Sequence, residues 1–288
     1  MGITTQALYT DAATLSMESV NWVHDIQAWS WDAGAIFADG KGINTIYEKE
    51  VLVGRATTWD FDMHQSSGAT EASPGSDPDD WEEKTGLDVT TITIGGVVYV
   101  TRCKSIGYNL VNKPTKTDGK AINDVDGFPV RGRLGLTFDV ELMEATGDGD
   151  SPIIYNLAKE ATRANFQGAS AVCYGTYSFV IGNVPFAGNA SFSKPVLKVT
   201  NDDIQILSLS ITNRGTPTTI PTSGASSHVL AIAAFASPPV CAFDFRTGRN
   251  TMAGNAYIHS LRGTANADAI ISMSGRLQAR GTVTYGTA

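Results

Sequence analysis

The residues of this chain that come nearest to a catalytic arrangement are Ser191 and Lys194, which have the spacing S-x-x-K. A lysine amine in this position can activate a serine hydroxyl as a nucleophile. The arrangement needs a helix, because side chains three residues apart share a helix face. Here the motif lies in an alternating stretch typical of a strand, on which residues three apart point to opposite faces. We therefore expect neither residue to be catalytic and the chain not to be an enzyme.

Metal-binding residues are sparse and badly spaced. The four histidines, at positions 24, 64, 228 and 259, are dispersed, with no pair of cysteines nearby, which is not the spacing of a zinc site. Residues 123–127 (NDVDG) look like part of a calcium loop but lack the later ligands and the closing glutamate. We expect this segment to be a turn, and the acidic run 77–83 to be a solvated loop. No metal and no other cofactor is expected.

Two tryptophans have a spacing that suits ligand binding. Trp29 and Trp31 stand two residues apart in an alternating stretch, so their side chains would share one strand face. Exposed rings in this arrangement could stack on a carbohydrate. The other interpretation is packing, in the core or against another subunit, which is common for large aromatic side chains.

Composition favours a β-rich protein whose surface is partly covered by neighbouring subunits. Only 17% of the 288 residues are charged, below the usual quarter, whereas glycine occurs 29 times. The net charge of −8 argues against a protein that grips nucleic acid, because binding phosphates requires clustered lysine and arginine. No stretch of about 18 apolar residues occurs, so no membrane-spanning helix is expected. The cysteines Cys103, Cys173 and Cys241 are expected to be buried free thiols.

Alternation of apolar and polar residues predicts that most of the chain forms strands. The clearest candidates are residues 26–32, 56–64, 97–102, 134–143, 172–180, 204–212, 240–245 and 270–278. Apolar residues at helical spacing predict a helix over 151–166, with Pro152 in its first turn, and a shorter helix over 227–236. The expected fold class is mainly β, with one or two short helices.

An internal repeat is the strongest pattern in the chain. Residues 188–218 align without a gap to residues 254–284, with ten identities where about two are expected by chance. The repeated positions include Gly188, Asn189, Ala190, Asp202, Arg214 and Gly215, matched by Gly254, Asn255, Ala256, Asp268, Arg280 and Gly281. Each copy follows a predicted helix and a cysteine-containing strand. A repeat of this length indicates the folding unit.

A weaker repeat precedes the strong one along the chain. We call the two copies of the weaker repeat the fronts and the two copies of the stronger repeat the backs. The matched segments are 25–31 with 104–110 and 54–62 with 132–139. The order front, front, back, back is explained if one unit is inserted into another at an exposed loop, where insertion is tolerated. The expected organisation is an outer unit of 1–70 plus 222–288, a linker of 71–96, and an inner unit of 97–218, arising by internal duplication. The alternative is that both fronts and both backs form one continuous sheet.

These patterns resemble the tail tube proteins of long-tailed bacteriophages. In that family a helix and a strand precede a G-x-A strand, a short acidic link and an alternating strand that ends near glycine. The similar segments here are 151–166, 172–180, 188–192, 202–203 and 204–215. The front resembles the family's Trp-containing strand and long loop, followed by a glycine and a tryptophan that enter the next strand, here Gly54 and Trp59. The inner front lacks a tryptophan after Gly132.

The resemblance implies β-sandwich or barrel units that continue their sheets into closed rings, which stack into a tube for DNA. It further implies that a chain with two such units forms a trimeric ring of six-fold appearance. The expected partners are other copies of this chain, other phage tail proteins, and passing double-stranded DNA that is not bound specifically. The expected location is the virion tail, after synthesis in the cytoplasm of the bacterial host.

Four acidic residues are candidates for the lining of such a tube. Asp60 and Asp62 lie on the polar side of one predicted strand, and Asp139 and Glu141 on that of the matching strand. Their charge would repel DNA phosphates and let the duplex slide. The other interpretation is an ordinary solvated strand face. Alternative functions are another ring component of the tail (baseplate, neck or tail terminator) or a carbohydrate-binding β-sandwich for decoration or receptor binding.

Overall fold

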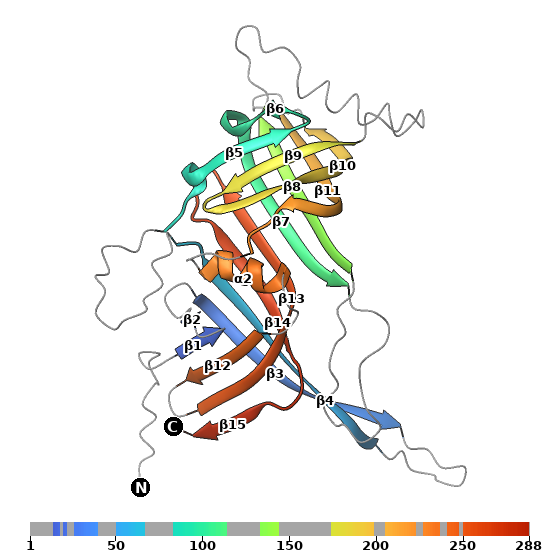
Figure 1. The fold of residues 1–288 in the computed structure, drawn as a ribbon, viewed down its shortest axis with the longest axis vertical. Coiled ribbons are helices and arrows are strands. Elements are labelled where there is room, and N and C mark those ends of the chain that lie inside the picture. Colours follow the sequence, from blue (N-terminus) through green and yellow to red (C-terminus); the bar gives the residue numbers. More distant parts are fainter. Residues whose placement is uncertain are drawn as a thin grey trace.

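The protein is mainly β, as the alternation predicted, and the strands described here pair antiparallel in one hydrogen-bonded network (Figure 1). The computed structural model describes residues 14–17, 20–21, 26–39, 50–66, 83–113, 133–143, 174–198, 205–222, 227–236, 241–247 and 250–287. The strands are β1 (Thr14–Met17), β2 (Val20–Asn21), β3 (Ile26–Asp39), β4 (Glu50–His64), β5 (Val89–Ile94), β6 (Val97–Val98), β7 (Cys103–Lys113), β8 (Arg133–Met143), β9 (Tyr174–Ile181), β10 (Val184–Lys198), β11 (Ile206–Thr219), β12 (Cys241–Thr247), β13 (Asn250–Asn266), β14 (Ser272–Ala279) and β15 (Thr284–Thr287). The helices are η3 (Gly86–Asp88), η4 (Val100–Arg102) and α2 (Ser227–Ala236).

The strands form two groups with the same order. We call β1–β4, α2 and β12–β15 the outer half, and β5–β11 the inner half. Neighbouring strands in the outer half follow the order β3-β4-β14-β13-β12-β1-β2. Those in the inner half follow the order β7-β8-β11-β10-β9-β5-β6. Each inner strand therefore has one outer strand in the matching place, and the halves lie one above the other in Figure 1.

The sequence repeat is also a repeat of strand register. Ala190 on β10 lies opposite Asn213 on β11. The repeat aligns these two residues with Ala256 and Ala279, which lie opposite each other on β13 and β14. The pair Lys198 and Ile206 at the other end is matched in the same way by Thr264 and Ser272. Between these ends both ladders contain a register shift, after Ser193 in one and after Ile258 in the other. The two back parts thus share their pairing at both ends, and their register shifts begin within one aligned residue of each other.

The front strands also match, but two residues away from the expected alignment. Cys103 lies opposite Leu142, and Ile26 lies opposite Met63, each just before a register shift. Position 26 therefore matches position 103, so segment 25–31 corresponds to 102–108 and not to 104–110. The error kept the side-chain faces correct because the period of a strand is two residues.

Two further expectations differ from the structure. Residues 97–102, expected as one strand, form the short β6 and the 3₁₀ helix η4. Part of the expected linker 71–96 belongs to the sheet, because β5 pairs with β9 along its length. β5 takes the place in the inner half that β1 takes in the outer half, beside β12.

The helix predicted over 227–236 is confirmed as α2, whereas the helix predicted over 151–166 lies outside the described residues.

The core lies where each sheet curls over itself. Phe138 on β8 packs against Phe179 on β9, with ring centroids 4.8 Å apart, although two strands separate β8 from β9 in the sheet. Trp59 on β4 packs in the same way against Phe243 on β12, at 4.6 Å. Trp59 and Phe138 are almost fully buried, at 1% and 0% exposure. Because the buried residues of both halves form one continuous cluster, the halves share a core.

The halves are joined edge to edge by β13 and β7. Beyond its register shift, β13 pairs with β14 on one edge and, from Ser260 to Asn266, with β7 on the other edge. Helix α2 also bridges the halves, because the buried His228 Nε2 forms a hydrogen bond with the hydroxyl of Tyr108 on β7. The sheet therefore continues from one half into the other without a break.

Candidate functional site

The four acidic residues lie on the outward side of the sheet. On β4, Asp60 and Asp62 alternate with the buried Trp59, Phe61 and Met63. On β8, Asp139 and Glu141 alternate in the same way with buried residues. Asp60 and Asp139 occupy matching positions, since Asp60 lies opposite Arg276 and Asp139 lies opposite Ser210, the residue that the repeat aligns with Arg276.

The strand register brings the two acidic pairs onto one continuous face, which we call the polar face. Residues directly opposite one another on neighbouring strands point to the same side of a sheet. One row across the face consists of Asp62, Ser274, Arg262, Asn109, Thr137, Thr212 and Ser191, each opposite the next. A second row consists of His64, Ser272, Thr264, Gly107, Asp139, Ser210 and Ser193. Serine, threonine and asparagine dominate these rows, with few bulky side chains.

The polar face carries charges of both signs. Arg276 Nε donates to Asp60 Oδ1 at 2.6 Å, and Arg276 Nη2 donates to Asp60 Oδ2 at 2.8 Å. These hydrogen bonds hold the pKa of Asp60 below its usual value. The matching Asp139 faces Ser210 and is exposed, and Glu141 accepts a hydrogen bond from Ser105 Oγ at 3.2 Å. The outer pair is thus partly neutralised by an arginine, whereas among the described residues no ion pair of this kind is seen for Asp139 or Glu141.

Comparison with models of known protein families and with curated proteins found no match. We therefore infer the function from the geometry of the polar face and of its edges.

The polar face ends at two strand edges. Among the described strands, β3 pairs only with β4, so the edge along Ala28 to Gly34 carries no partner. At the other end, β9 stops pairing with β10 at Ser191, and from Ser193 to Lys198 the described partner of β10 is β11 alone. Open edges of this length are templates for pairing with another chain.

Residues identical in the two repeats support the strands and turns. Gly188 lies opposite Tyr177, and Gly254 lies opposite the matching Phe243. A Cβ atom at Gly188 would stand 3.1 Å from the Tyr177 ring, and one at Gly254 would stand 3.3 Å from the Phe243 ring. Glycine therefore leaves room for an aromatic ring to lie across the neighbouring strand.

The other repeated residues have matching places as well. Gly215 and Gly281 both have positive φ, 76° and 79°, which glycine adopts without steric cost. Ala190 and Ala256 are fully buried. The polar members Asn189, Arg214, Asn255, Asp268 and Arg280 are exposed, and Asp202 lies outside the described residues.

The remaining candidates for chemistry are not brought together. Ser191 and Lys194 both lie on strand β10 and not on a helix, and a register shift of β10 follows Ser193. In the part of the chain that the structure describes, no three His, Cys, Asp or Glu side chains are grouped so as to hold a metal ion. None of the described helical segments has the length and apolar character needed to span a bilayer. Segment 123–127 and most of 77–83 lie outside the described residues.

The two tryptophans that could stack on a carbohydrate, Trp29 and Trp31, have different surroundings. Trp29 packs against Phe245 of β12, with ring centroids 5.9 Å apart, and is partly buried. Trp31 is 49% exposed and lies 6.3 Å from the ring of Tyr285, which is 51% exposed. Trp31 lies opposite the buried Trp59, so it belongs to the apolar side of the sheet.

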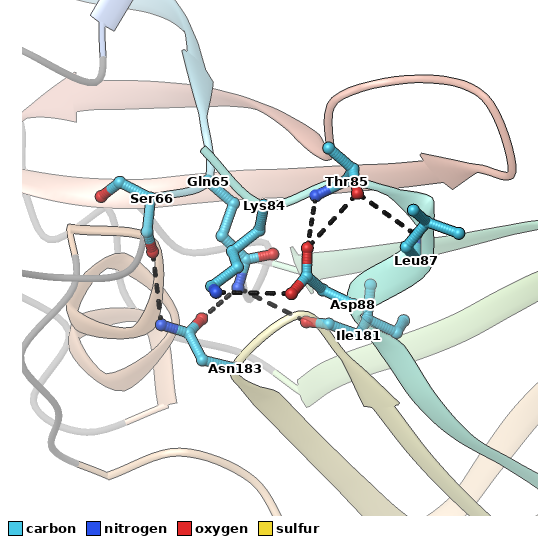
Figure 2. A network of polar contacts seen from close by, with 8 residues as sticks. All are labelled: Gln65, Ser66, Lys84, Thr85, Leu87, Asp88, Ile181 and Asn183. Atoms are coloured by element: carbon cyan, nitrogen blue, oxygen red, sulfur yellow. Dashed lines mark hydrogen bonds and ion pairs between the residues drawn. The ribbon is translucent and has the colours of Figure 1, made fainter. Parts of the chain in front are cut away.

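A polar network that sequence reasoning missed fastens the crossing between the halves (Figure 2). The buried Gln65 side chain, just after β4, donates to Asn183 Oδ1 and to the Ile181 carbonyl in the turn between β9 and β10. Asn183 Nδ2 in turn donates to the Ser66 carbonyl at 3.5 Å. The segment that leads into β5 is held at the same place, because the Lys84 amide donates to the Gln65 carbonyl at 2.7 Å. No local sequence pattern marks such contacts between distant segments.

Proposed function

We propose that the protein is a structural virion protein that assembles into stacked rings forming a phage tail tube, a conduit for DNA. The observation that carries the proposal is the continuous polar face, which runs through both halves and ends at edges of β3 and β10 that have no partner among the described strands. A curved sheet with open edges can join neighbouring sheets, and closure into a ring removes the exposed edges. The matching strand order of the halves also supports an origin by internal duplication.

The chemistry of the polar face suits a DNA conduit. Its rows consist largely of small hydroxyl and amide side chains, and the exposed carboxylates of Asp62 and Asp139 lie among them. Carboxylates repel phosphates, so a duplex in contact with this face would slide past it without being held. The side chains that pack the core point to the other side of the sheet.

Electron microscopy of the purified chain tests the proposal. At high protein concentration we expect rings or tubes of uniform bore in negative stain. A species that stays strictly monomeric under these conditions would count heavily against the proposal. Rings that never stack would favour another ring component of the tail, such as a baseplate, neck or tail-terminator protein.

The exposed ring pair of Trp31 and Tyr285 supports a second candidate function, binding of carbohydrate by a β-sandwich used for decoration or receptor binding. A glycan-binding screen distinguishes this function from the tube. Binding of the unmodified chain that is lost with Trp31→Ala would favour it. The control is Trp29→Ala, which removes a partly buried ring.

A further inference from the structure

The two strands that correspond to the joint between the halves, β10 and β3, do not pair with each other within the chain. Strand β13 matches β10, and β7 matches β3, as the register partners of these strands show. Inside the chain, β13 pairs with β7. Among the described strands, the matching β10 and β3 each have no partner on one edge, along the stretch that would make the same contact. They lie in different halves, at the two ends of the polar face.

We propose that β10 of one chain pairs antiparallel with β3 of a second copy of this chain, in the register of the internal β13–β7 joint. In that joint Arg262 lies opposite Asn109, Gly263 opposite Tyr108, and Thr264 opposite Gly107. The transferred pairs are Val196 with Asp32, Leu197 with Trp31, and Lys198 with Ser30. The inference rests on the proposed function only in that both require copies of the chain to associate.

Exposed apolar residues mark both edges. Trp31 is 49% exposed, whereas Tyr108, which holds the matching place on β7, is 2% exposed because the internal joint and α2 cover it. Val196, on the edge of β10 and on the polar side of the sheet, is 50% exposed. Pairing of the two edges would cover part of the Trp31 side chain, as the internal joint covers part of Tyr108. Burial of large apolar side chains is the main driving force of such an interface.

The polar sides of the two edges are complementary. In the transferred register Asp32 and Lys198 are diagonal neighbours on the polar face, and both are exposed in the single chain. Opposite charges in neighbouring positions across a strand pair stabilise the pairing and its register. A slip by one residue would place Trp31 on the same side as Lys198 and would lose both contacts. The position of Pro195 at the register shift of β10 is one that a strand tolerates.

The contact is heterologous, because the two copies contribute different strands. Repetition of a heterologous contact generates a ring if the rotation closes. The shared sheet would then run through β3, β4, β14, β13, β7, β8, β11 and β10 of each copy and continue into the next. The internal joint and the joint between copies would be equivalent, so every contact in the ring would use the same pairing.

Disulfide trapping tests the register. We would prepare the double variant Asp32→Cys with Val196→Cys, whose thiols face each other across the proposed pair, within the Cα separation that a disulfide requires. The matched control is Ala33→Cys with Val196→Cys. Position 33 is also exposed, but its side chain points to the other side of the sheet. Both variants retain the native cysteines, so any background reaction of these thiols is common to them.

After mild oxidation we expect the first variant to yield at least tenfold more reductant-sensitive covalent oligomer than the control on a denaturing gel. Equal yields in both variants, or no covalent oligomer from either, would overturn the register. If rings are nevertheless present in micrographs, the proposed function survives and only this inference fails. If the chain is monomeric and neither variant is linked, both fail. Circular dichroism spectra like that of the unmodified chain confirm that each variant is folded.

Discussion

At the scale of single residues, the repeated glycines have two different physical roles. Gly188 and Gly254 give room to an aromatic ring on the adjacent strand, whereas Gly215 and Gly281 adopt a positive φ at the end of the repeat. The first role depends on what a Cβ atom would contact and the second on backbone conformation alone. The repeat signature is thus explained by packing and turn geometry, with no need for a catalytic role.

Substitution of these glycines by alanine separates the two roles. In Gly188→Ala, the new Cβ atom would stand 2.7 Å from Asn213 Oδ1, which a hydrogen bond from the Tyr177 hydroxyl holds in place, and 3.1 Å from the Tyr177 ring. We expect the free energy of unfolding to fall by about 1–3 kcal/mol because of overpacking. In Gly254→Ala the nearest atom is 3.2 Å away, so a smaller loss is expected. Denaturant titration measures both. Equal stability of Gly188→Ala and the unmodified chain would refute the packing role.

The control variants are at Gly215. A Cβ atom there meets nothing within 4 Å, so Gly215→Ala would lose about 1–2 kcal/mol through the positive φ alone. Asparagine tolerates this conformation better than alanine, so Gly215→Asn should lose less.

At the scale of elements, the joint between the halves depends on the length of β13 and on α2. The register shift after Ile258 separates the part of β13 that pairs with β12 from the part that pairs with β7. Helix α2 covers this junction and contributes the buried His228, whose Nδ1 atom has no hydrogen-bond partner among the described residues. Burial lowers the pKa of His228 to about 3. The joint therefore contains a neutral histidine that becomes charged when the chain unfolds in mild acid.

The pH dependence of stability reports on this histidine. In the unfolded chain a histidine titrates near 6.5, so the contribution of His228 is complete above that pH and decreases as pH falls toward 3. We expect the free energy of unfolding to fall by about 2 kcal/mol more between pH 7 and pH 4.5 in the unmodified chain than in His228→Gln. Denaturant titrations at both pH values measure the difference.

His259, whose pKa burial also lowers, is present in both proteins, so its contribution cancels in this comparison. The glutamine can retain the contact with Tyr108. Parallel pH profiles of the two proteins would show that His228 is charged or accessible in the folded chain.

At the scale of the whole molecule, the polar face is a feature that both halves build together. It is continuous because the register of the β13–β7 joint keeps the polar side chains of both halves on the same side of the sheet. The ion pair of Asp60 with Arg276 reduces the negative charge of its outer part. About half of each of these two side chains is exposed, so the pair contributes little to stability, on the order of 0–1 kcal/mol. Its more important effect is on the field that a ligand near the face would experience.

Charge reversal on the polar face tests its role as a lining. We expect Asp139→Lys to assemble as the unmodified chain does but to retain double-stranded DNA at low salt, with retention that falls steeply as salt rises. Asp268→Lys is the control, because Asp268 is also exposed but lies in the turn between β13 and β14, off the face. Filter-binding assays on assembled protein give the measurement. Equal DNA retention by the two variants would remove Asp139 from the lining.

The sequence by itself determined the local features of this protein. Alternation identified most strands and placed Asp60, Asp62, Asp139 and Glu141 on their outward sides, and apolar spacing located α2. The internal repeat anticipated strands that pair in the same register. These features depend on the period of a strand or a helix, which neighbouring residues record.

Only the tertiary structure decided which strands are neighbours. It placed β5 in the sheet, moved the front alignment by two residues, and brought Arg276 to Asp60 across 216 positions of the chain. It also revealed the β13–β7 joint and the two open edges. Pairing between distant strands depends on bulges and on the packing of the whole core, and no short stretch of sequence specifies these.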